Sequence, residues 1–212
     1  MKNALDKVAE IGILPVIAVP AVDVALPLAK ALVDGGIPAI EVTLRNEFAL
    51  ASINAMRDAH PEMVIAAGTI LRPEQVGAVK EAGADFVVTP GLDPDIVKAA
   101  KENDMPIVPG VCNPTEITTA VKLGLETLKF FPAEISGGVA ALTLYHGPFP
   151  NVRFVPTGGM TMDNIGTYLA KPFVAACGGS YMAKGADIKA GNFELITKNC
   201  RRCVATAKEA RK

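Results

Sequence analysis

The chain has 212 residues, half of them apolar, which is ample for a full hydrophobic core in one large or two small domains. A formal net charge of −1, with no long blocks of one sign, argues against a basic face for nucleic acid or an anionic membrane surface. Only 5% of the residues are aromatic and Trp is absent, so base-stacking platforms are not expected either.

The N-terminal segment carries charges at intervals where a secretion signal would need an unbroken apolar run. Residues 11–33 are apolar enough to suggest a membrane span, but Pro15, Pro20 and Pro27 interrupt them. A buried strand followed by a helix fits this segment better. We therefore expect a cytoplasmic protein with no membrane partner.

Strand-like and helix-like segments alternate along the chain. After a short opening helix, strands are expected at residues 14–19, 39–44, 63–69, 86–89, 106–111, 127–131, 153–157 and 174–177. Helices are expected at residues 23–35, 48–60, 73–82, 94–102, 115–123, 139–145, 163–169 and 193–208. Strands rich in Val, Ile and Phe with few charges are typical of a parallel sheet buried on both faces.

These eight strand and helix pairs leave no room for a linker. They predict one α/β domain over residues 1–212, a (β/α)8 TIM barrel with a short N-terminal helix. A doubly wound open sheet is the alternative, but it usually needs fewer strands, and no Gly-x-Gly-x-x-Gly follows the first one. In a barrel the C-terminal ends of the strands face one mouth, so functional residues are sought there.

A lysine, Lys129, lies in the apolar segment 127–131. Alternation along a strand puts Thr127, Lys129 and Phe131 on one face, so Lys129 points into an enclosed space beside an aromatic ring. Burial disfavours an ammonium ion, and only a neutral amine attacks a carbonyl. Lys129 is therefore a candidate to form a Schiff base with a keto substrate. The alternative is a lysine at a strand end that reaches back to water.

The second expected strand carries Glu41, Thr43 and Arg45 on one face, with Glu41 deepest and Arg45 at the rim. A carboxylate inside a barrel is costly unless it is paired, and Lys129 would also point inward. One interpretation is a structural ion pair. The functional interpretation gives Glu41 the proton transfers that imine formation and carbon–carbon cleavage require. The planar guanidinium of Arg45 would then bind a substrate carboxylate.

Other strand ends offer turn residues and possible anion contacts. Thr69 ends the third strand, and Pro90 follows the fourth, where a tight turn is the simpler explanation. Paired glycines follow the last two strands, in Gly158-Gly159 and in Gly178-Gly179-Ser180. Such turns let backbone N–H groups approach an anion, and in this architecture they are the usual place for a phosphate.

The cysteines and histidines give no sign of a metal or redox site. Cys200 and Cys203 have C-x-x-C spacing, but they lie in a helix-like stretch with no second pair downstream. His60 and His146 belong to no ligand cluster, and Cys112 is expected to be a small apolar residue. No metal and no cofactor is expected.

Several motifs occur together and in order over nearly the whole chain. They are Glu41-Val-Thr-Leu-Arg45, Ala67-Gly-Thr69, Thr89-Pro-Gly-Leu92, Lys129-Phe-Phe-Pro-Ala-Glu134, Gly147-Pro-Phe149, Arg153-Phe-Val-Pro-Thr-Gly-Gly159 and Gly178-Gly-Ser180. As a set they resemble the KDPG/KHG aldolases, bacterial class I aldolases of the Entner–Doudoroff route.

The resemblance implies a homotrimeric barrel that cleaves 2-keto-3-deoxy-6-phosphogluconate (KDPG) to pyruvate and glyceraldehyde 3-phosphate. Often it also cleaves 2-keto-4-hydroxyglutarate (KHG) to pyruvate and glyoxylate. In that family, Lys129 would match the Schiff-base lysine and Glu41 the general acid/base. The matching substrate-binding residues are Arg45 and Thr69 for the pyruvate carboxylate, Pro90, Phe131 beside the imine, Thr157 near the substrate, and Gly158, Gly159, Gly179 and Ser180 at the phosphate.

Other functions stay open at this point. Galactonate-type aldolases of the same family lack the Thr43-Leu-Arg45 pattern and typically carry an arginine where this chain has Val19-Pro20, which favours the gluconate type. A phosphosugar epimerase or isomerase would share the phosphate turns and use Glu41 as its base, but would form no imine. A sensor that binds a phosphorylated keto acid would bind without turnover.

Overall fold

The structure, a computed structural model, describes residues 3–212 of the chain. Its strands are β1 (Ile13–Ile17), β2 (Ala39–Thr43), β3 (Val64–Gly68), β4 (Phe86–Val88), β5 (Ile107–Val108), β6 (Gly110–Val111), β7 (Thr127–Phe130), β8 (Arg153–Pro156) and β9 (Cys177–Gly179). Its helices are α1 (Ala4–Ile11), a short 3₁₀ helix (Val22–Val24), α2 (Ala25–Asp34), α3 (Ala49–Ala59), α4 (Glu74–Glu81), α5 (Pro94–Glu102), α6 (Pro114–Lys122), α7 (Gly138–His146), α8 (Ile165–Leu169), α9 (Gly185–Lys189) and α10 (Phe193–Ala210).

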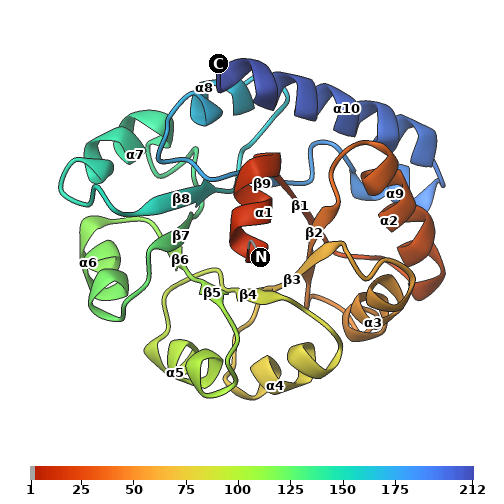
Figure 1. The fold of residues 1–212 in the computed structure, drawn as a ribbon, viewed down its shortest axis with the longest axis horizontal. Helices are drawn as coiled ribbons and strands as arrows, with labels where there is room; N and C mark the ends of the chain where they lie inside the picture. Colours follow the sequence, from red (N-terminus) through yellow and green to blue (C-terminus); the bar gives the residue numbers. More distant parts are fainter. Residues whose placement is uncertain (1–2) are drawn as a thin grey trace.

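The strands form a curled, parallel arrangement in two sheets. Six of them hydrogen-bond in the order β5-β4-β3-β2-β1-β9, and three more in the order β6-β7-β8. Figure 1 shows the strands around the middle of the molecule with helices outside them, whereas a doubly wound open sheet would carry helices on both faces. The α/β fold and the curled parallel sheet agree with the prediction from sequence.

Helix α1 lies across the middle of the view in Figure 1 and covers one end of the interior. Leu5 and Val8 of α1 line a small enclosed cavity of about 10 Å³ together with Leu14 and Phe86 from the strands. Asn3 caps the helix by accepting a hydrogen bond from the Asp6 N–H. Leu14 and Phe86 lie near the starts of β1 and β4, so α1 closes the N-terminal end of the strands and leaves the opposite end for a site.

The prediction of one continuous strand at residues 106–111 is wrong. The segment is divided into β5, which pairs with β4, and β6, which pairs with β7. Pro109 lies between them, and proline has no N–H to donate to a ladder. The chain therefore changes its pairing partner at this residue.

The strand predicted at residues 174–177 is displaced toward the C-terminus. The ladder with β1 begins at Cys177, while Val174 forms only an isolated bridge to Phe154. Residues 174–177 are all buried, so their apolar pattern reflects burial and does not indicate hydrogen bonding to a neighbouring strand. Helix α8 also begins two residues later than predicted, and the short α9 was not predicted.

The apolar run at residues 11–33 forms β1, the 3₁₀ helix and most of α2. Among residues 3–212, no helix has the length and the apolar composition that crossing a membrane requires. The segment is accounted for by burial inside the fold.

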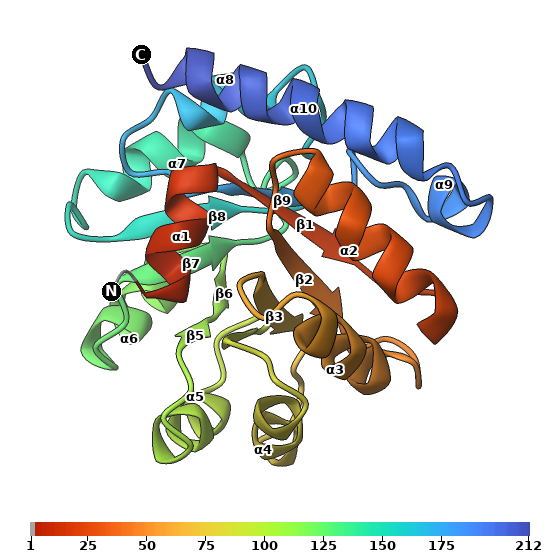
Figure 2. The same cartoon turned by 45° about the vertical axis from the view of Figure 1, so that its right-hand side comes forward.

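The last helix, α10, runs along the outside of the molecule against α2 and α8 in both views (Figures 1 and 2). Its buried residues Ile196, Cys200, Cys203 and Ala207 recur at helical spacing and form the face that packs inward. At the end of α2, Gly35 allows close approach, because a Cβ placed there would lie 2.3 Å from Cys200 Cβ.

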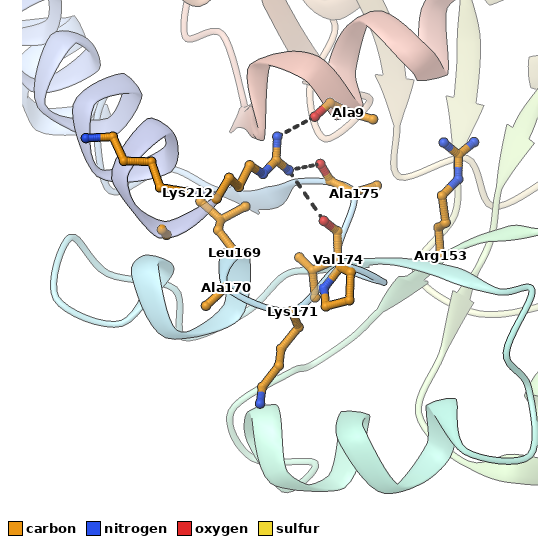
Figure 3. Close-up of a pocket in the computed structure, with 11 residues that line it drawn as sticks. Ala9, Arg153, Leu169, Ala170, Lys171, Val174, Ala175 and Lys212 are labelled. Atoms are coloured by element: carbon orange, nitrogen blue, oxygen red, sulfur yellow. Dashed lines mark hydrogen bonds between the residues drawn. The ribbon is translucent and has the colours of Figure 1, made fainter.

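Arg211, just after α10, ties the end of the chain to its beginning. Its guanidinium donates hydrogen bonds to the carbonyl oxygens of Ala9 and Ala175, both at 2.6 Å, as drawn in Figure 3. It also lies over Gly12, where a Cβ would be 3.0 Å from the guanidinium carbon. The C-terminal segment is therefore anchored to the junction of α1 and β1 and to the approach to β9.

Candidate active site

Lys129 and Glu41 meet inside the molecule although they come from different sheets. Glu41 is the third residue of β2 and Lys129 the third residue of β7. Lys129 Nζ lies 3.3 Å from Glu41 Oε1, and the two side chains are only 7% and 2% exposed. The alternative in which Lys129 reaches back to water is therefore wrong. A buried amine and a buried carboxylate in contact can carry both covalent and proton-transfer chemistry.

A glycine of β3 makes room for the Glu41 carboxylate. A Cβ placed on Gly68 would lie 2.1 Å from Glu41 Oε1 and 2.6 Å from its Cγ, which no real side chain tolerates. Gly68 was not among the site residues predicted from sequence. It lies in the Ala67-Gly-Thr69 motif, but its role becomes clear only from the contact between Gly68 of β3 and the Glu41 side chain of β2.

Phe131 connects Lys129 to the first glycine turn. Lys129 Nζ lies 5.3 Å from the centroid of the Phe131 ring, within range of a cation–π contact. A Cβ on Gly158 would lie 3.4 Å from Phe131 Cδ2 and 3.2 Å from Pro132 Cα. The predicted position of Phe131 beside the lysine agrees with this geometry.

The two glycine turns lie side by side. Thr157, which is buried, forms a bridge with Gly178, and a Cβ on Gly178 would lie 2.4 Å from Thr157 Oγ1. A Cβ on Gly179 would lie 3.5 Å from Met160 Cβ, in the turn that follows β8. Gly158 and Gly159 have φ angles of 93° and 85°, which favour glycine. Adjacent glycine turns of this kind can bring several N–H groups to one anion.

The remaining predicted residues follow the C-terminal ends of β2, β3, β4 and β9 by one or two positions. Arg45 and Ser180 are exposed, just beyond β2 and β9. Thr69 follows β3 with a φ angle of 61°, a left-handed conformation that is uncommon outside glycine. The carbonyl of Pro90 packs against Gly110, which is paired in register with Lys129. Within residues 3–212, no side-chain hydrogen bond joins Arg45, Thr69 or Ser180 to the Lys129–Glu41 pair.

Thr43 is a second feature of the site that was not assigned a role from sequence. Its hydroxyl is buried on the face of β2 that carries Glu41, and it has no hydrogen-bond partner among the described residues. Buried hydroxyls are usually paired, so this one is available to a ligand or a water. The alternation of residues along β2 placed Thr43 on this face, but it could not show that the hydroxyl would lack a partner in the fold.

The pocket drawn in Figure 3, about 400 Å³ in volume, lies away from Lys129 and Glu41. Its lining includes Arg153, Lys171 and Lys212, but in Figure 3 these three side chains point away from one another. They therefore do not converge on a common ligand. Over the same residues 3–212, no group of three or more His, Cys, Asp or Glu residues is placed to hold a metal ion.

Comparison with known proteins gives one consistent result. Residues 5–199 match the family model described as KDPG and KHG aldolase. The chain is 43% identical to the KHG/KDPG aldolase of Escherichia coli K12 over 208 residues, which is 98% of each chain. It is also similar to the crystal structure of KDPG aldolase from Legionella pneumophila with pyruvate captured as a covalent carbinolamine intermediate. That match has a TM-score of 0.91 and 37% identity, and it covers 94% of this chain and 97% of the other.

A native KDPGal structure is less similar in sequence, at 27% identity, with a TM-score of 0.85 and coverage of 93% of this chain and 95% of that one. Sequence, fold and the buried lysine–glutamate pair thus agree. The chain belongs to the KDPG and KHG aldolase family.

Proposed function

We propose that the protein is a class I aldolase that cleaves KDPG to pyruvate and glyceraldehyde 3-phosphate, and KHG to pyruvate and glyoxylate. The observation that carries this proposal is the buried pair of Lys129 Nζ and Glu41 Oε1 at 3.3 Å, at corresponding depths of two parallel strands. The Legionella relative, which holds pyruvate as a covalent carbinolamine, supports the same chemistry.

In the proposed reaction, Lys129 attacks the keto carbon of the substrate, and loss of water gives a protonated imine. Glu41 removes the C4 hydroxyl proton through a water, and the electrons of the C3–C4 bond move into the imine to give an enamine and release the aldehyde. Reprotonation of the enamine and hydrolysis of the imine release pyruvate. Glu41, in contact with Nζ, is placed to serve each proton transfer.

The other residues have roles in binding under this proposal. Arg45 and Thr69 bind the pyruvate carboxylate, Pro90 and Phe131 enclose the imine, and Thr157 lies near the substrate. Gly158, Gly159, Gly179 and Ser180 hold the phosphate. The adjacency of the two glycine turns, through the Thr157 to Gly178 bridge, supports a single phosphate site between them.

We also propose that the two sheets complete one (β/α)8 barrel, a single domain over residues 1–212, in which β5 and β6 count as one interrupted strand. Only Pro109 separates β5 from β6. On the other side, isolated bridges from Phe154 to Val174 and from Thr157 to Gly178 connect β8 to the segment that contains β9.

A homotrimer remains the proposed assembly. Ile135, in the turn before α7, is 86% exposed, and Leu144 on α7 is 76% exposed. They are the two most exposed large apolar side chains among residues 3–212, which supports a contact with another chain near α7. A cytoplasmic location remains the proposed one, and the free thiols of Cys177, Cys200 and Cys203 are compatible with a reducing compartment.

The test is a cleavage assay with purified protein, in which pyruvate release from KDPG and from KHG is followed with a coupled dehydrogenase. Activity on KDPG supports the gluconate assignment. Cleavage of the galactonate analogue alone would move the protein to the galactonate type. Interconversion of phosphosugars without pyruvate release would favour an epimerase, and binding without turnover would favour a sensor.

A further inference from the structure

Tyr168 is a buried tyrosine that the aldol reaction does not use. It lies on α8, is 1% exposed, and donates a hydrogen bond from its hydroxyl to Oε1 of Glu134. Burial is the main cause that raises the pKa of Tyr168 above its usual range, and the hydrogen bond to Glu134 raises it further. The phenol therefore stays a hydrogen-bond donor at any pH at which the enzyme would work.

Glu134, the acceptor of that bond, lies directly against the first glycine turn. A Cβ placed on Gly159 would lie 2.4 Å from Glu134 Cγ and 2.6 Å from Glu134 Cβ, so the stem of this side chain covers Gly159. The backbone N–H of Glu134 also donates to the Gly158 carbonyl at 3.1 Å. The position of Glu134 and the conformation of the turn are therefore linked.

Asn164, which precedes α8, contacts the same turn from another direction. Its Nδ2 donates to the Gly159 carbonyl at 3.0 Å, while its Oδ1 accepts from the Thr161 N–H at 2.8 Å. Asn164 and Tyr168 are four residues apart, one helical turn, and so share a face of α8. The start of α8 thus contacts Gly159 directly through its N-cap Asn164, and the helix contacts it indirectly through Tyr168 and Glu134.

The charge of Glu134 gives the Tyr168 hydrogen bond a second effect. A carboxylate close to a bound phosphate repels it, and this repulsion grows as the two approach. The hydroxyl of Tyr168 draws Oε1 toward α8 and fixes the carboxylate there. Without the hydroxyl, the carboxylate of the exposed Glu134 side chain would be free to turn toward the ligand, and Cγ to move off Gly159.

We propose that Tyr168 is a positioning residue for phosphate recognition: through Glu134 it fixes the Gly158-Gly159 turn and holds a negative charge away from the substrate's phosphate. This inference rests on the proposed function, because it requires a phosphate at that turn. It assigns a substrate-selective effect to a residue on an outer helix. The effect concerns phosphorylated substrates alone, since KHG has no phosphate.

The experiment compares both substrates in Tyr168→Phe. Loss of one hydrogen bond to a charged group predicts a KM for KDPG that rises about tenfold, with kcat and the KM for KHG within about twofold of wild type. Tyr145→Phe is the matched control, because it removes a phenol whose ring packs on Phe130 and not against Glu134. It should leave both KM values unchanged.

Two variants at exposed Glu134 keep the test valid even if Tyr168→Phe folds poorly. Glu134→Gln retains the stem and an oxygen that accepts from Tyr168 but removes the charge, so its KM for KDPG should equal that of wild type or fall below it. Glu134→Ala keeps Cβ but removes Cγ and the carboxylate that accepts from Tyr168. The link between Tyr168 and the Gly158-Gly159 turn is then lost, so the KM for KDPG should rise while that for KHG does not.

Equal changes for both substrates, or no change in any of these variants, would overturn the positioning role. A wild-type protein that cleaves neither substrate would contradict the proposed function instead. The two failures are therefore distinguishable in one set of assays.

Discussion

At the scale of single residues, the site depends on glycines that leave space as much as on the groups that react. Lys129 and Glu41 can touch because Gly68, the last residue of β3, has no side chain where the Glu41 carboxylate lies. Gly178 does the same for Thr157, and Gly110 for the carbonyl of Pro90. Three strand positions thus have space for a neighbouring group and not for a Cβ.

Gly68→Ala tests this at the catalytic pair. The new methyl would displace the Glu41 carboxylate from Lys129, and a misplacement of about 1 Å in a catalytic group can cost about a hundredfold in rate. We expect kcat/KM for both substrates to fall by about that factor. Gly77→Ala, on α4 where a Cβ meets nothing closer than 3.7 Å, is the control and should keep wild-type activity. Wild-type kinetics in Gly68→Ala would show that Glu41 need not stay where it lies.

At the scale of elements, α10 is attached by a polar contact at its end and by buried sulfur along its length. Arg211 Nη1 donates to the Ala9 carbonyl and Nη2 to the Ala175 carbonyl, so one guanidinium links three parts of the fold. Cys200 and Cys203 lie on the inward face of the helix, and Cys203 Sγ is 3.3 Å from Met162 Sδ.

Arg211→Met keeps most of the aliphatic stem and removes the hydrogen bonds. Because the contact lies partly at the surface, we expect a loss of about 1 kcal/mol in the free energy of unfolding, measured by urea denaturation. Lys208→Met removes a charge from an exposed position of the same helix and should change stability by less than about 0.5 kcal/mol. Equal stability in the two variants would mean that the guanidinium does not anchor the helix.

The buried thiols on α10 should make the stability of the protein depend on pH above about pH 9. Burial raises the pKa of Cys200 and of Cys203 to about 12, from an ordinary value of 9.0. Their contribution to stability is therefore fully present below about pH 9 and is lost as the pH rises from 9 toward 12, because only the unfolded thiols ionise there.

Burial should also protect these thiols from reagents. At pH 8 the native protein should react with a thiol reagent at half-buried Cys112. The buried thiols of Cys177, Cys200 and Cys203 should react only in denaturant. Peptide mapping of the labelled protein checks this. Rapid labelling of Cys200 in the native protein would show that α10 opens far more easily than its packing implies.

At the scale of the whole molecule, the exposed apolar side chains near α7 bear on assembly. Replacing Ile135 and Leu144 together by Glu should convert a trimer into monomers, which sedimentation velocity would detect, because charges at an apolar contact are costly to bury. Leu71→Glu, a change at another exposed leucine, is the control and should leave assembly unchanged. Trimers that persist in the double variant would place the contact elsewhere.

The sequence was enough to predict the features that depend on local periodicity. Strand alternation correctly put Lys129 and Glu41 in the interior and half-buried Phe131 beside Lys129, and most strand positions agree to within a residue or two. It could not predict where β5 ends and β6 begins, because the change of partner at Pro109 is a property of the sheet. The hydrogen bond from Tyr168 to Glu134 joins residues that are 34 positions apart, so no local sequence pattern predicts it.

The measurement that tests the central claim most directly is reduction with borohydride in the presence of pyruvate, followed by peptide mapping of the added mass. We expect one reduced pyruvate adduct, on Lys129. We expect none in Lys129→Arg, because a guanidinium stays protonated and cannot form the imine. A folded protein that cleaves KDPG but carries no adduct on Lys129 would contradict a Schiff-base mechanism at this lysine.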